Sequence, residues 1–442
     1  MNSPPSSLLR SSAAANQAIG HRHSTANSQT ELRVLEQAYC VVTWLFFTSG
    51  LDTIFGDVAI ISTLLRYLIF AIALFFLCAR GRRSLHAASK GGGLWVVMAL
   101  SVASIAWSMS PADTIDSVRG EVLPMTAFAL YYASRFNIRE QMRIVCVALM
   151  IAAVLSLFYA VAIPSIGTHV GGEFDGAWRG LYSQKNVFSS TMTITMLLFY
   201  ILSIVNNDRK ERLVARVCLG FSVAMILLST SKSALVIFIV LLFAVALARL
   251  FRWRGRRSVL LLDLGGLIGL GGLAVFSVTW QAMAIALGKD PTLSARTYIW
   301  SGSLEKIVAQ PILGYGRAAF WTEGSRPAFE VGALASKGFV PSHAHNGYLD
   351  VGLDIGLVGL GVFFIGLIAT FGIALRRAYR ASEPEDLWPL AFLILLVIYN
   401  VTESLLLQRI TIYWVMYMTV FLSLRIWPRR TGQSVPEQPA PL

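Results

Sequence analysis

His343 and His345 lie one residue apart in the run PSHAHNGYL. A neutral imidazole is the side chain best suited to accept a proton near pH 7. His345 is therefore a candidate general base, and His343 is a weaker second candidate. A histidine at the edge of an apolar segment is also an ordinary amphipathic residue, and that simpler interpretation stays open for each histidine taken alone.

Cations and small polar residues gather in three other segments. Arg179, Lys185 and Asn186 occur in the run WRGLYSQKN, Lys232 in STSKS and Arg296 in ARTYIW. Arginine presents a fork that matches phosphate oxygens, and lysine presents a point charge. These segments could bind an anionic substrate. The alternative is that their cations are solvated or contact lipid phosphates.

Several ionisable residues lie within or beside apolar runs. Arg66 is inside one run, Glu403 is near the end of another, and Asp350 and Asp354 follow Asn346 at helical spacing, on one helix face. Such residues are costly within a bilayer and are usually functional. We expect Arg66 to pair with one of the acids, either in a substrate site or in a purely structural role.

The elements that must position these residues are apolar. Of 442 residues, 55% are hydrophobic and 14% are charged, against roughly 25% charged in a soluble domain. Several runs reach the ~20 residues that cross a bilayer as a helix, the form that satisfies its own backbone hydrogen bonds. We predict an all-α integral membrane protein with about twelve transmembrane helices, near 35–50, 57–79, 93–109, 122–135, 144–166, 186–205, 214–230, 232–250, 259–287, 346–375, 387–405 and 409–427.

Basic residues predict the orientation of these helices. With the N-terminus inside, the inner loops hold 25 of the 37 Lys and Arg residues, a bias typical of cytoplasmic loops. We expect both termini in the cytoplasm of a bacterial inner membrane. The net charge of +13 follows from this topology, and no nucleic-acid partner is expected. The inner cations fall at 10–33, 80–90, 135–143, 209–216, 249–257, 376–380 and 425–430.

The predicted organisation is a disordered tail over 1–33, a membrane domain over 34–427 and a second tail over 428–442. The outer, periplasmic loop 288–345 is long enough to be functional. An apolar stripe at helical spacing predicts a helix over 294–309 within it.

The four cysteines lie in or beside apolar runs, with no metal-ligand spacing. The outer loops contain no Asp-x-Asp pair. We expect no disulfide, no metal site and no cofactor.

From Trp107 to Arg409 the chain resembles the O-antigen ligase and polymerase superfamily. The most specific part is the run HNGYL that begins at His345, and His345 and Gly356 fit the family's His-x10-Gly spacing. The segment that begins at Arg296 and the following turn GYG look like the family's Arg-led loop helix and Gly-x-Gly turn.

Within the superfamily, the runs WRGLYSQKN and NVTES are most similar to exopolysaccharide polymerases. Ligases have Arg-x3-Leu where this chain has Trp300, and many members have Ser-Arg where it has Ser231-Lys232. These departures favour a polymerase over a ligase.

The resemblance implies a GT-C-like fold and glycosyl transfer on the outer face of the membrane. The donor would be an undecaprenyl-diphosphate-linked oligosaccharide, and the acceptor a sugar hydroxyl. A diphosphate leaves readily, so the site needs cations for the developing charge. His345 would be the base and Arg296 the catalytic phosphate-binding residue. Substrate-binding residues would be Arg179, Lys185, Asn186, Lys232, His343, Asn346, Glu403 and Arg66. Trp178, Tyr182, Trp300 and Trp321 could stack on sugar rings.

Two alternatives stay open. The first is an O-antigen ligase that transfers polysaccharide to lipid A core or to protein. The second is a transporter or flippase of lipid-linked glycans, against which the polar residues gather at the outer face and not at the midplane. Membrane lipids and a chain-length regulator are further expected partners.

Overall fold

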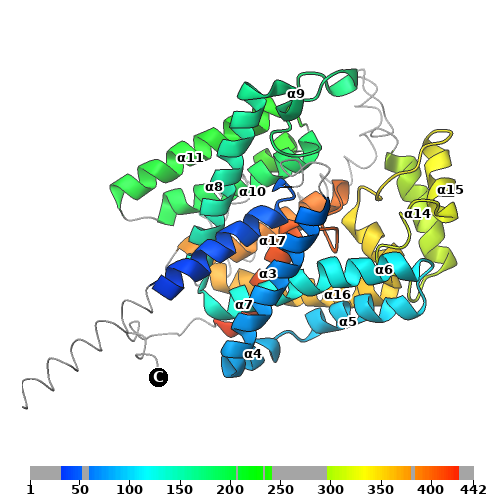
Figure 1. The fold of residues 1–442 in the computed structure, drawn as a ribbon, viewed down its shortest axis with the longest axis horizontal. Coiled ribbons are helices and arrows are strands. Elements are labelled where there is room, and N and C mark those ends of the chain that lie inside the picture. The colour runs from blue at the N-terminus through cyan, green and yellow to red at the C-terminus, as the bar shows by residue number, and fades with distance from the viewer. Residues whose placement is uncertain are drawn as a thin grey trace, which may run out of the picture.

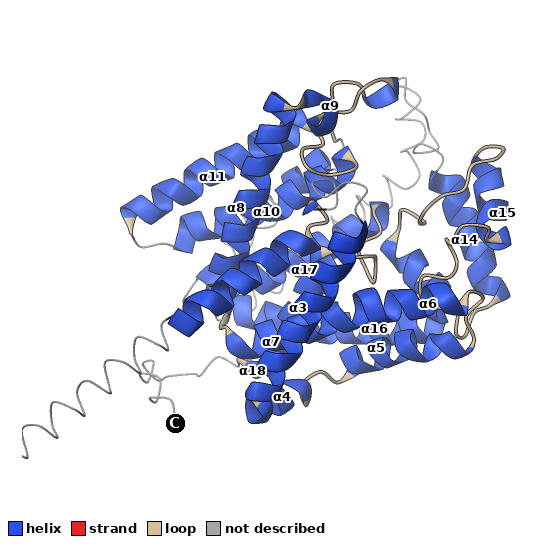
Figure 2. Cartoon of the chain, in the orientation of Figure 1, coloured by secondary structure: helices blue, strands red, loops and turns tan. Residues whose placement is uncertain are grey.

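The computed structural model describes residues 31–51, 59–205, 208–231, 234–240, 296–379 and 384–427. This part of the chain is helical, with one isolated bridge between Thr168 and Trp178 (Figure 2). Residues 31–47, which begin within the predicted N-terminal tail, and residues 234–240 are helical too. The named α-helices are α3 (Ala59–Ala79), α4 (Gly81–Ala88), α5 (Gly93–Ala103), α6 (Pro111–Ser117), α7 (Leu123–Arg135), α8 (Ile138–Ala162), α9 (Pro164–Gly167), α10 (Lys185–Val205), α11 (Arg209–Leu228), α14 (Arg296–Ala309), α15 (Arg326–Ala335), α16 (Gly347–Tyr379), α17 (Trp388–Thr402) and α18 (Ile412–Ile426).

Short helical turns of other types join some of these helices. A 3₁₀ turn, η1 (Ser104–Ala106), follows α5, and a π-helical turn, η2 (Val118–Val122), joins α6 to α7. Two more 3₁₀ turns, η3 (Gly172–Phe174) and η4 (Pro384–Leu387), precede α10 and α17.

Five of the described helices are long and apolar enough to cross a membrane: Ile60–Ala79, Ile138–Ala162, Lys185–Ile204, Gly347–Tyr379 and Glu385–Thr402. A sixth crossing results if the pair Gly81–Ala88 and Gly93–Ala106, bent by 91°, is one span. The predicted spans 232–250 and 259–287 lie largely or wholly outside the described residues, and each of the other predicted spans coincides with a helix. The all-α membrane class is therefore confirmed, with five or six candidate spans among the described helices, and the number of about twelve stays a prediction.

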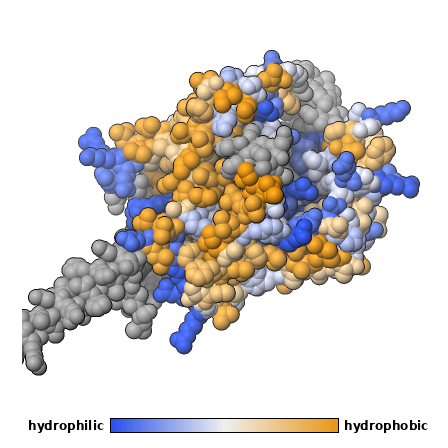
Figure 3. Space-filling model, viewed as in Figure 1, coloured by the Kyte–Doolittle hydropathy of each residue, from blue (hydrophilic) through white to orange (hydrophobic). Residues whose placement is uncertain are grey.

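The apolar surface of α3 is turned outward. Ile60, Leu64, Leu68 and Phe75 are each more than half exposed, a pattern that suits contact with lipid and not with water. Hydrophobic residues cover the middle of the face seen in Figure 3, and hydrophilic residues gather at the far ends of α11 and α15.

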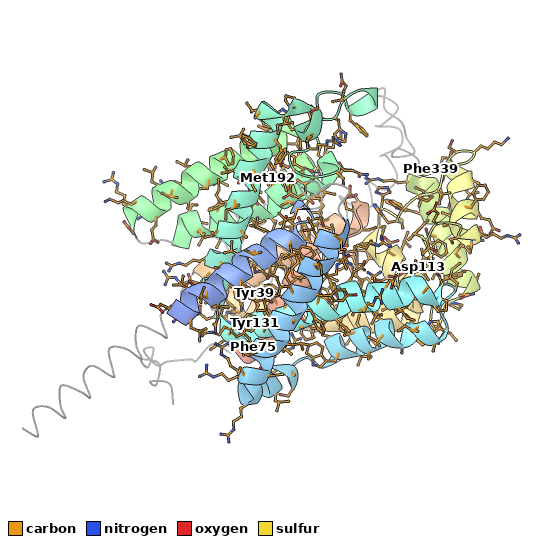
Figure 4. The ribbon with its side chains drawn as sticks, in the orientation of Figure 1. Tyr39, Phe75, Asp113, Tyr131, Met192 and Phe339 are labelled. Atoms are coloured by element: carbon orange, nitrogen blue, oxygen red, sulfur yellow. The ribbon has the colours of Figure 1, made fainter. Side chains whose placement is uncertain are left out.

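Aromatic side chains fill the interior between the first helices. Tyr39, Trp44 and Phe128 are joined by edge-on contacts, and Phe128 and Tyr132 stack with ring centroids 5.4 Å apart. Tyr39 and Tyr131, labelled in Figure 4, approach each other from two helices with centroids 5.9 Å apart. The short helix α7 is thus packed from several sides, between α3 and α18.

Ion pairs join the predicted inner loops at one end of the helices. The fully buried carboxylate of Glu36 pairs with Arg80 and Arg135, and Arg377 pairs with Asp386 at 2.6 Å. Three more pairs extend this set: Arg33–Glu140, Arg139–Glu385 and Arg143–Glu211. Loops that the charge count assigned to one face therefore meet in space.

The helix α16 is broken at Ile355 and Gly356. Gly356 has a φ of +69°, in the left-handed region that favours glycine, and a Cβ there would lie 2.2 Å from the Ile312 carbonyl oxygen. The segment 311–316 satisfies the backbone groups that the break frees, as a broken helix within a membrane requires. The hydrogen bonds run from Tyr315 N–H to Leu353 O (2.7 Å), Gly316 N–H to Asp354 O (3.0 Å), Leu357 N–H to Pro311 O (2.7 Å) and Val358 N–H to Ile312 O (3.3 Å).

The other end of the molecule holds the predicted outer segments. In Figure 1, α8, α10 and α11 form one side, while α14 and α15 stand apart from them at the other. α5, α6 and α16 lie below α14 and α15 in that view. The described part of the predicted loop 288–345 begins at residue 296 and contains α14 and α15.

Candidate active site

The turn from His343 to His345 precedes α16 and is held at its central residue. The Ala344 N–H donates to the Asp350 carboxylate at 3.0 Å, and the Ala344 carbonyl accepts from the Trp300 indole at 3.0 Å. His345 has a φ of 52°, a left-handed conformation that costs a residue other than glycine about 1–2 kcal/mol. The two hydrogen bonds therefore hold a turn that the backbone does not favour by itself.

The Asp350 carboxylate is buried and joins three segments. Besides the Ala344 N–H, it accepts from the Trp321 indole at 2.8 Å and from the Gln408 amide at 3.2 Å. Trp321 precedes α15, and Gln408 lies in the loop between α17 and α18. Asp350 thus fixes where the histidine turn lies relative to both of these segments.

His343 has one ring nitrogen engaged. Its Nδ1 accepts the His345 N–H at 3.1 Å, and the two ring centroids are 4.1 Å apart. Burial, reinforced by the neighbouring His345 imidazole, lowers the pKa of His343 to about 4. A neutral imidazole whose Nδ1 accepts carries its proton on Nε2. This arrangement favours a role for His343 in shaping the turn and donating a hydrogen bond over a role as base.

Glu403 stands between Arg296 and His345. The Arg296 Nη2 donates to Glu403 Oε1 at 3.0 Å, and its Nη1 donates to the Thr402 carbonyl at 2.5 Å. His345 Nδ1 is 3.8 Å from Glu403 Oε2, and among the described residues this buried nitrogen has no hydrogen-bond partner. The Glu403 side chain is only 12% exposed. The structure thus brings Arg296, Glu403 and His345, three of the predicted residues, into one group.

A cavity of about 130 Å³ adjoins this group. It lies between the end of the helix at 31–47, the first turns of α10 and the loop that follows α17. Its polar lining includes Asn186, His343, Glu403, Ser404, Gln408 and Arg409. Three predicted substrate-binding residues therefore line the same cavity: Asn186, His343 and Glu403.

Asn346 caps α16. Its side-chain oxygen accepts the backbone N–H groups of Tyr348 and Leu349, at 3.0 and 3.2 Å, and its amide nitrogen donates to the Val401 carbonyl at 3.3 Å. An asparagine at this position satisfies helix N–H groups that otherwise have no partner. These bonds occupy much of the carboxamide that was predicted to bind a sugar or to orient His345.

Arg179 and Lys185 lie in a different group. The Arg179 guanidinium donates to the backbone carbonyls of Ser165 and Ile166 in α9 and of Ser183, at 2.8 Å for Ile166. Lys185 Nζ lies 3.8 Å from the centroid of the Phe174 ring, and the Lys185 N–H donates to His169 Nε2 at 3.2 Å. Burial and these two cations lower the pKa of His169. The predicted residue Lys232 lies outside the described residues.

The expected pairing of Arg66 with Asp350, Asp354 or Glu403 is wrong within the described part of the chain. Its guanidinium packs against Gly120 of η2, where a Cβ would lie 2.9 Å from Nη1, and its buried Nε has no hydrogen-bond partner among the residues that the structure describes. The acids have nearer donors, because the folded loops supply them.

The partner of Asp354 is Arg317, which the sequence did not single out. Arg317 is 2% exposed and donates to Asp354 at 2.9 Å and to Glu121 at 3.2 Å. Its place just after the turn GYG gave no sign of burial. The helical spacing of Asp350 and Asp354 was visible in the sequence, but the loop donors that meet them depend on the tertiary fold. The Trp300 indole N–H donates to the Ala344 carbonyl and the Trp321 indole N–H donates to the Asp350 carboxylate, so only the ring faces of these two residues are left to stack on sugars.

Apolar helices around a polar group at one end indicate an all-helical membrane protein, with the polar group as its candidate site. Residues 217–364 match the model of the family described as O-antigen ligase. This range contains Arg296, both histidines of the turn and Gly356. The resemblance to this family is therefore confirmed over residues 217–364.

Two curated relatives share parts of the chain. One is the "Exopolysaccharide production protein ExoQ" of Rhizobium meliloti (strain 1021), 33% identical over 109 residues, which cover 23% of this chain and 24% of that protein. The other is the "Putative polysaccharide ligase RP358" of Rickettsia prowazekii (strain Madrid E), 33% identical over 84 residues, which cover 17% of this chain and 19% of that protein. The matches thus span about a quarter and a fifth of these relatives.

Proposed function

We propose that the protein is a polysaccharide polymerase of the periplasmic face of the bacterial inner membrane. It would transfer a glycan from an undecaprenyl-diphosphate-linked donor to a sugar hydroxyl of a lipid-linked acceptor. No metal would take part. The observation that carries this proposal is the group of Arg296, Glu403 and His345 beside a polar cavity.

In this proposal His345 is the base. The carboxylate of Glu403 faces Nδ1, so it would stabilise the imidazolium that forms when Nε2 accepts a proton. The distance of 3.8 Å between His345 Nδ1 and Glu403 Oε2 is longer than a hydrogen bond. Such contacts in active sites often shorten only when substrate binds.

The reaction would proceed by displacement at the anomeric carbon of the donor. The acceptor oxygen forms the new bond to that carbon as its proton passes to His345 Nε2. The bond from the anomeric carbon to the diphosphate oxygen breaks, and undecaprenyl diphosphate leaves with the electron pair. A diphosphate is stable as an anion, so cations near it are the main requirement.

Arg296 would supply one of these cations. A guanidinium has five N–H donors. Among the described residues, the Thr402 carbonyl and Glu403 occupy two of those of Arg296, so three are left for phosphate oxygens. Lys232 and Lys185 stay proposed phosphate-binding residues. The Arg179 guanidinium donates to backbone carbonyls on both sides of it in the chain. Arg179 would therefore affect substrate binding mainly by holding the conformation of the segment 165–183.

A chain-length assay on purified lipid-linked repeat units, with the reconstituted full chain, tests the proposal. We expect His345→Ala and Arg296→Ala each to lower polymerisation at least about 100-fold, the usual scale for losing a positioned base or an electrostatic contact. Arg326→Ala is the matched control, because that arginine is 90% exposed on α15. Near wild-type polymerisation by His345→Ala would refute the assignment of the base, and full activity in Arg296→Ala would remove the phosphate contact.

A ligase is the second candidate, favoured by the name of the Rickettsia relative. The same assay distinguishes it when lipid A core is offered as acceptor: a ligase extends that acceptor, and a polymerase lengthens the repeat chain. A flippase would leave the glycan length unchanged. A chain-length regulator remains a proposed partner.

A further inference from the structure

We propose that Arg409 binds the diphosphate of the lipid-linked donor at the mouth of the cavity. This inference rests on the proposed function and adds a substrate-binding residue to it. Among the described residues that line the cavity, Arg409 alone carries a permanent positive charge. Arg296, the other proposed phosphate-binding arginine, pairs with Glu403 and is not itself part of the lining of this cavity.

The turn that carries Arg409 is strained and anchored. Leu407 and Ile410, which flank Gln408 and Arg409, both have positive φ angles, of 50° and 35°. Such conformations are unfavourable for residues other than glycine, and they persist where the surroundings impose them, often at ligand sites. Two contacts impose them here. Gln408 donates to the buried Asp350, and Ser49 Oγ donates to the Ile410 carbonyl at 2.7 Å.

The anchor on Asp350 links this turn to the proposed base. One oxygen of Asp350 accepts the Ala344 N–H beside His345, and the other accepts Gln408 beside Arg409. A single buried carboxylate therefore sets the positions of the base and of the cation relative to each other. A donor held by Arg409 would adjoin the cavity that His343 and Glu403 also line.

The present partner of Arg409 holds it weakly. Arg409 Nε is 3.6 Å from Glu121 Oε1, and the arginine side chain is 75% exposed. The other oxygen of Glu121 already accepts from Arg317 at 3.2 Å and from Ser117 Oγ at 2.7 Å. A pair this long, whose arginine is largely exposed to solvent, contributes little, so a doubly charged diphosphate can replace it. Within the described part of the chain, Arg409 is thus a cation whose N–H groups make no hydrogen bond, and Arg317 keeps Glu121 paired if Arg409 moves.

A lipid-linked diphosphate is the ligand that this position favours. The cavity lies beside apolar helix ends, and Tyr413 and Ile412 of α18 line it next to the polar loop. A second guanidinium, that of Arg66 on α3, lies against Gly120. Gly120 precedes Glu121, the present partner of Arg409, within η2. The two phosphates of a lipid-linked diphosphate match the two guanidinium groups, and its apolar tail matches the apolar helix ends beside the cavity.

Direct binding of undecaprenyl diphosphate to the full chain in neutral detergent micelles tests this inference. We expect Arg409→Ala to weaken binding about tenfold or more, the usual scale for losing a hydrogen bond to a charged group, and Arg409→Lys to weaken it less. Arg326→Ala should bind as the wild type does. The melting temperature of Arg409→Ala should match that of the wild type, because the side chain is mostly exposed.

Two competition arms identify the source of the phosphate. Inorganic pyrophosphate should displace the lipid only at much higher concentration, and an excess of phosphatidylglycerol should not displace it. Displacement by phosphatidylglycerol at equal concentration would mean general contact with anionic lipid and would overturn the inference. Unchanged affinity in Arg409→Ala would overturn it and leave the proposed function intact. Failure of the wild-type chain to bind undecaprenyl diphosphate would overturn both.

Discussion

His343 and His345 differ in what their ring nitrogens contact, although one residue separates them. His343 uses Nδ1 to accept a backbone N–H, whereas His345 directs Nδ1 toward Glu403. The sequence could identify both as candidates, because the residue type and the run HNGYL are visible in it. It could not rank them by environment, because Glu403, the carboxylate neighbour of His345, is 58 residues away in the chain and the burial of His343 depends on the tertiary fold.

The low pKa of His343 predicts a loss of stability in mild acid. The unfolded chain binds a proton on this histidine near pH 6.5, whereas the folded chain binds it only near pH 4. Below pH 6.5 the unfolded state therefore holds more protons, and the free energy of unfolding falls as the pH drops toward 4. We expect His343→Gln, which can still accept the His345 N–H, to remove about 1–3 kcal/mol of this loss.

Thermal unfolding of the detergent-solubilised protein between pH 7 and pH 4 measures this effect. The melting temperature of His343→Gln should fall less steeply than that of the wild type. His86→Gln is the control, because His86 is exposed on α4, among the predicted inner loops. If the melting temperatures of His343→Gln and the wild type fell equally with pH, this would contradict the low pKa that burial gives His343.

At the scale of elements, the break in α16 shows what a sequence pattern can and cannot reveal. The His-x10-Gly spacing marked Gly356 as special, and the turn GYG marked the segment near Gly314. Only the fold shows that these two features meet, with 311–316 bonded to the groups that the break frees. The apolar run 346–375 gave no sign of a break, because glycine and leucine are common throughout it.

Substitution of Gly356 should therefore cost far more than substitution of another glycine in the same helix. Gly356→Ala places a Cβ 2.2 Å from the Ile312 carbonyl oxygen in a left-handed conformation, which should lower the free energy of unfolding by at least about 2 kcal/mol. Gly361→Ala meets no atom within 4 Å and should raise it by about 0.5–1 kcal/mol, since alanine favours helix. Denaturant titration of both variants checks the contrast, and equal effects would mean that the break in α16 is not present.

At the scale of the whole molecule, hydrophobic length and charge bias predicted the helices and their grouping. Arginines from separate inner loops meet around Glu36 and near Asp386, as a two-sided arrangement requires. Sequence length alone could not distinguish a crossing from a bent pair such as Gly81–Ala88 with Gly93–Ala106, because the 91° bend depends on packing. It also placed α7 among the spans, although this helix of 13 residues is packed on several sides by other helices.

The orientation of the molecule can be tested with a matched pair of lysines. Lys90 is exposed between α4 and α5, and Lys337 is exposed after α15. The bias of basic residues places Lys90 inside and Lys337 outside. In a background with Cys40, Cys78, Cys146 and Cys218 replaced by alanine, a membrane-impermeant maleimide should label Lys337→Cys in intact spheroplasts. It should label Lys90→Cys only in inverted vesicles.

This experiment bears directly on the proposed reaction, because the histidine turn follows Lys337 within the same loop. If Lys337→Cys reacts from outside, the cavity lined by His343 and Glu403 opens toward the periplasm, where a lipid-linked polymerisation would take place. Labelling of Lys337→Cys only in inverted vesicles would place the base and its acceptor on the cytoplasmic side. A polymerase of the outer face would then be excluded whatever the residues of its site could do.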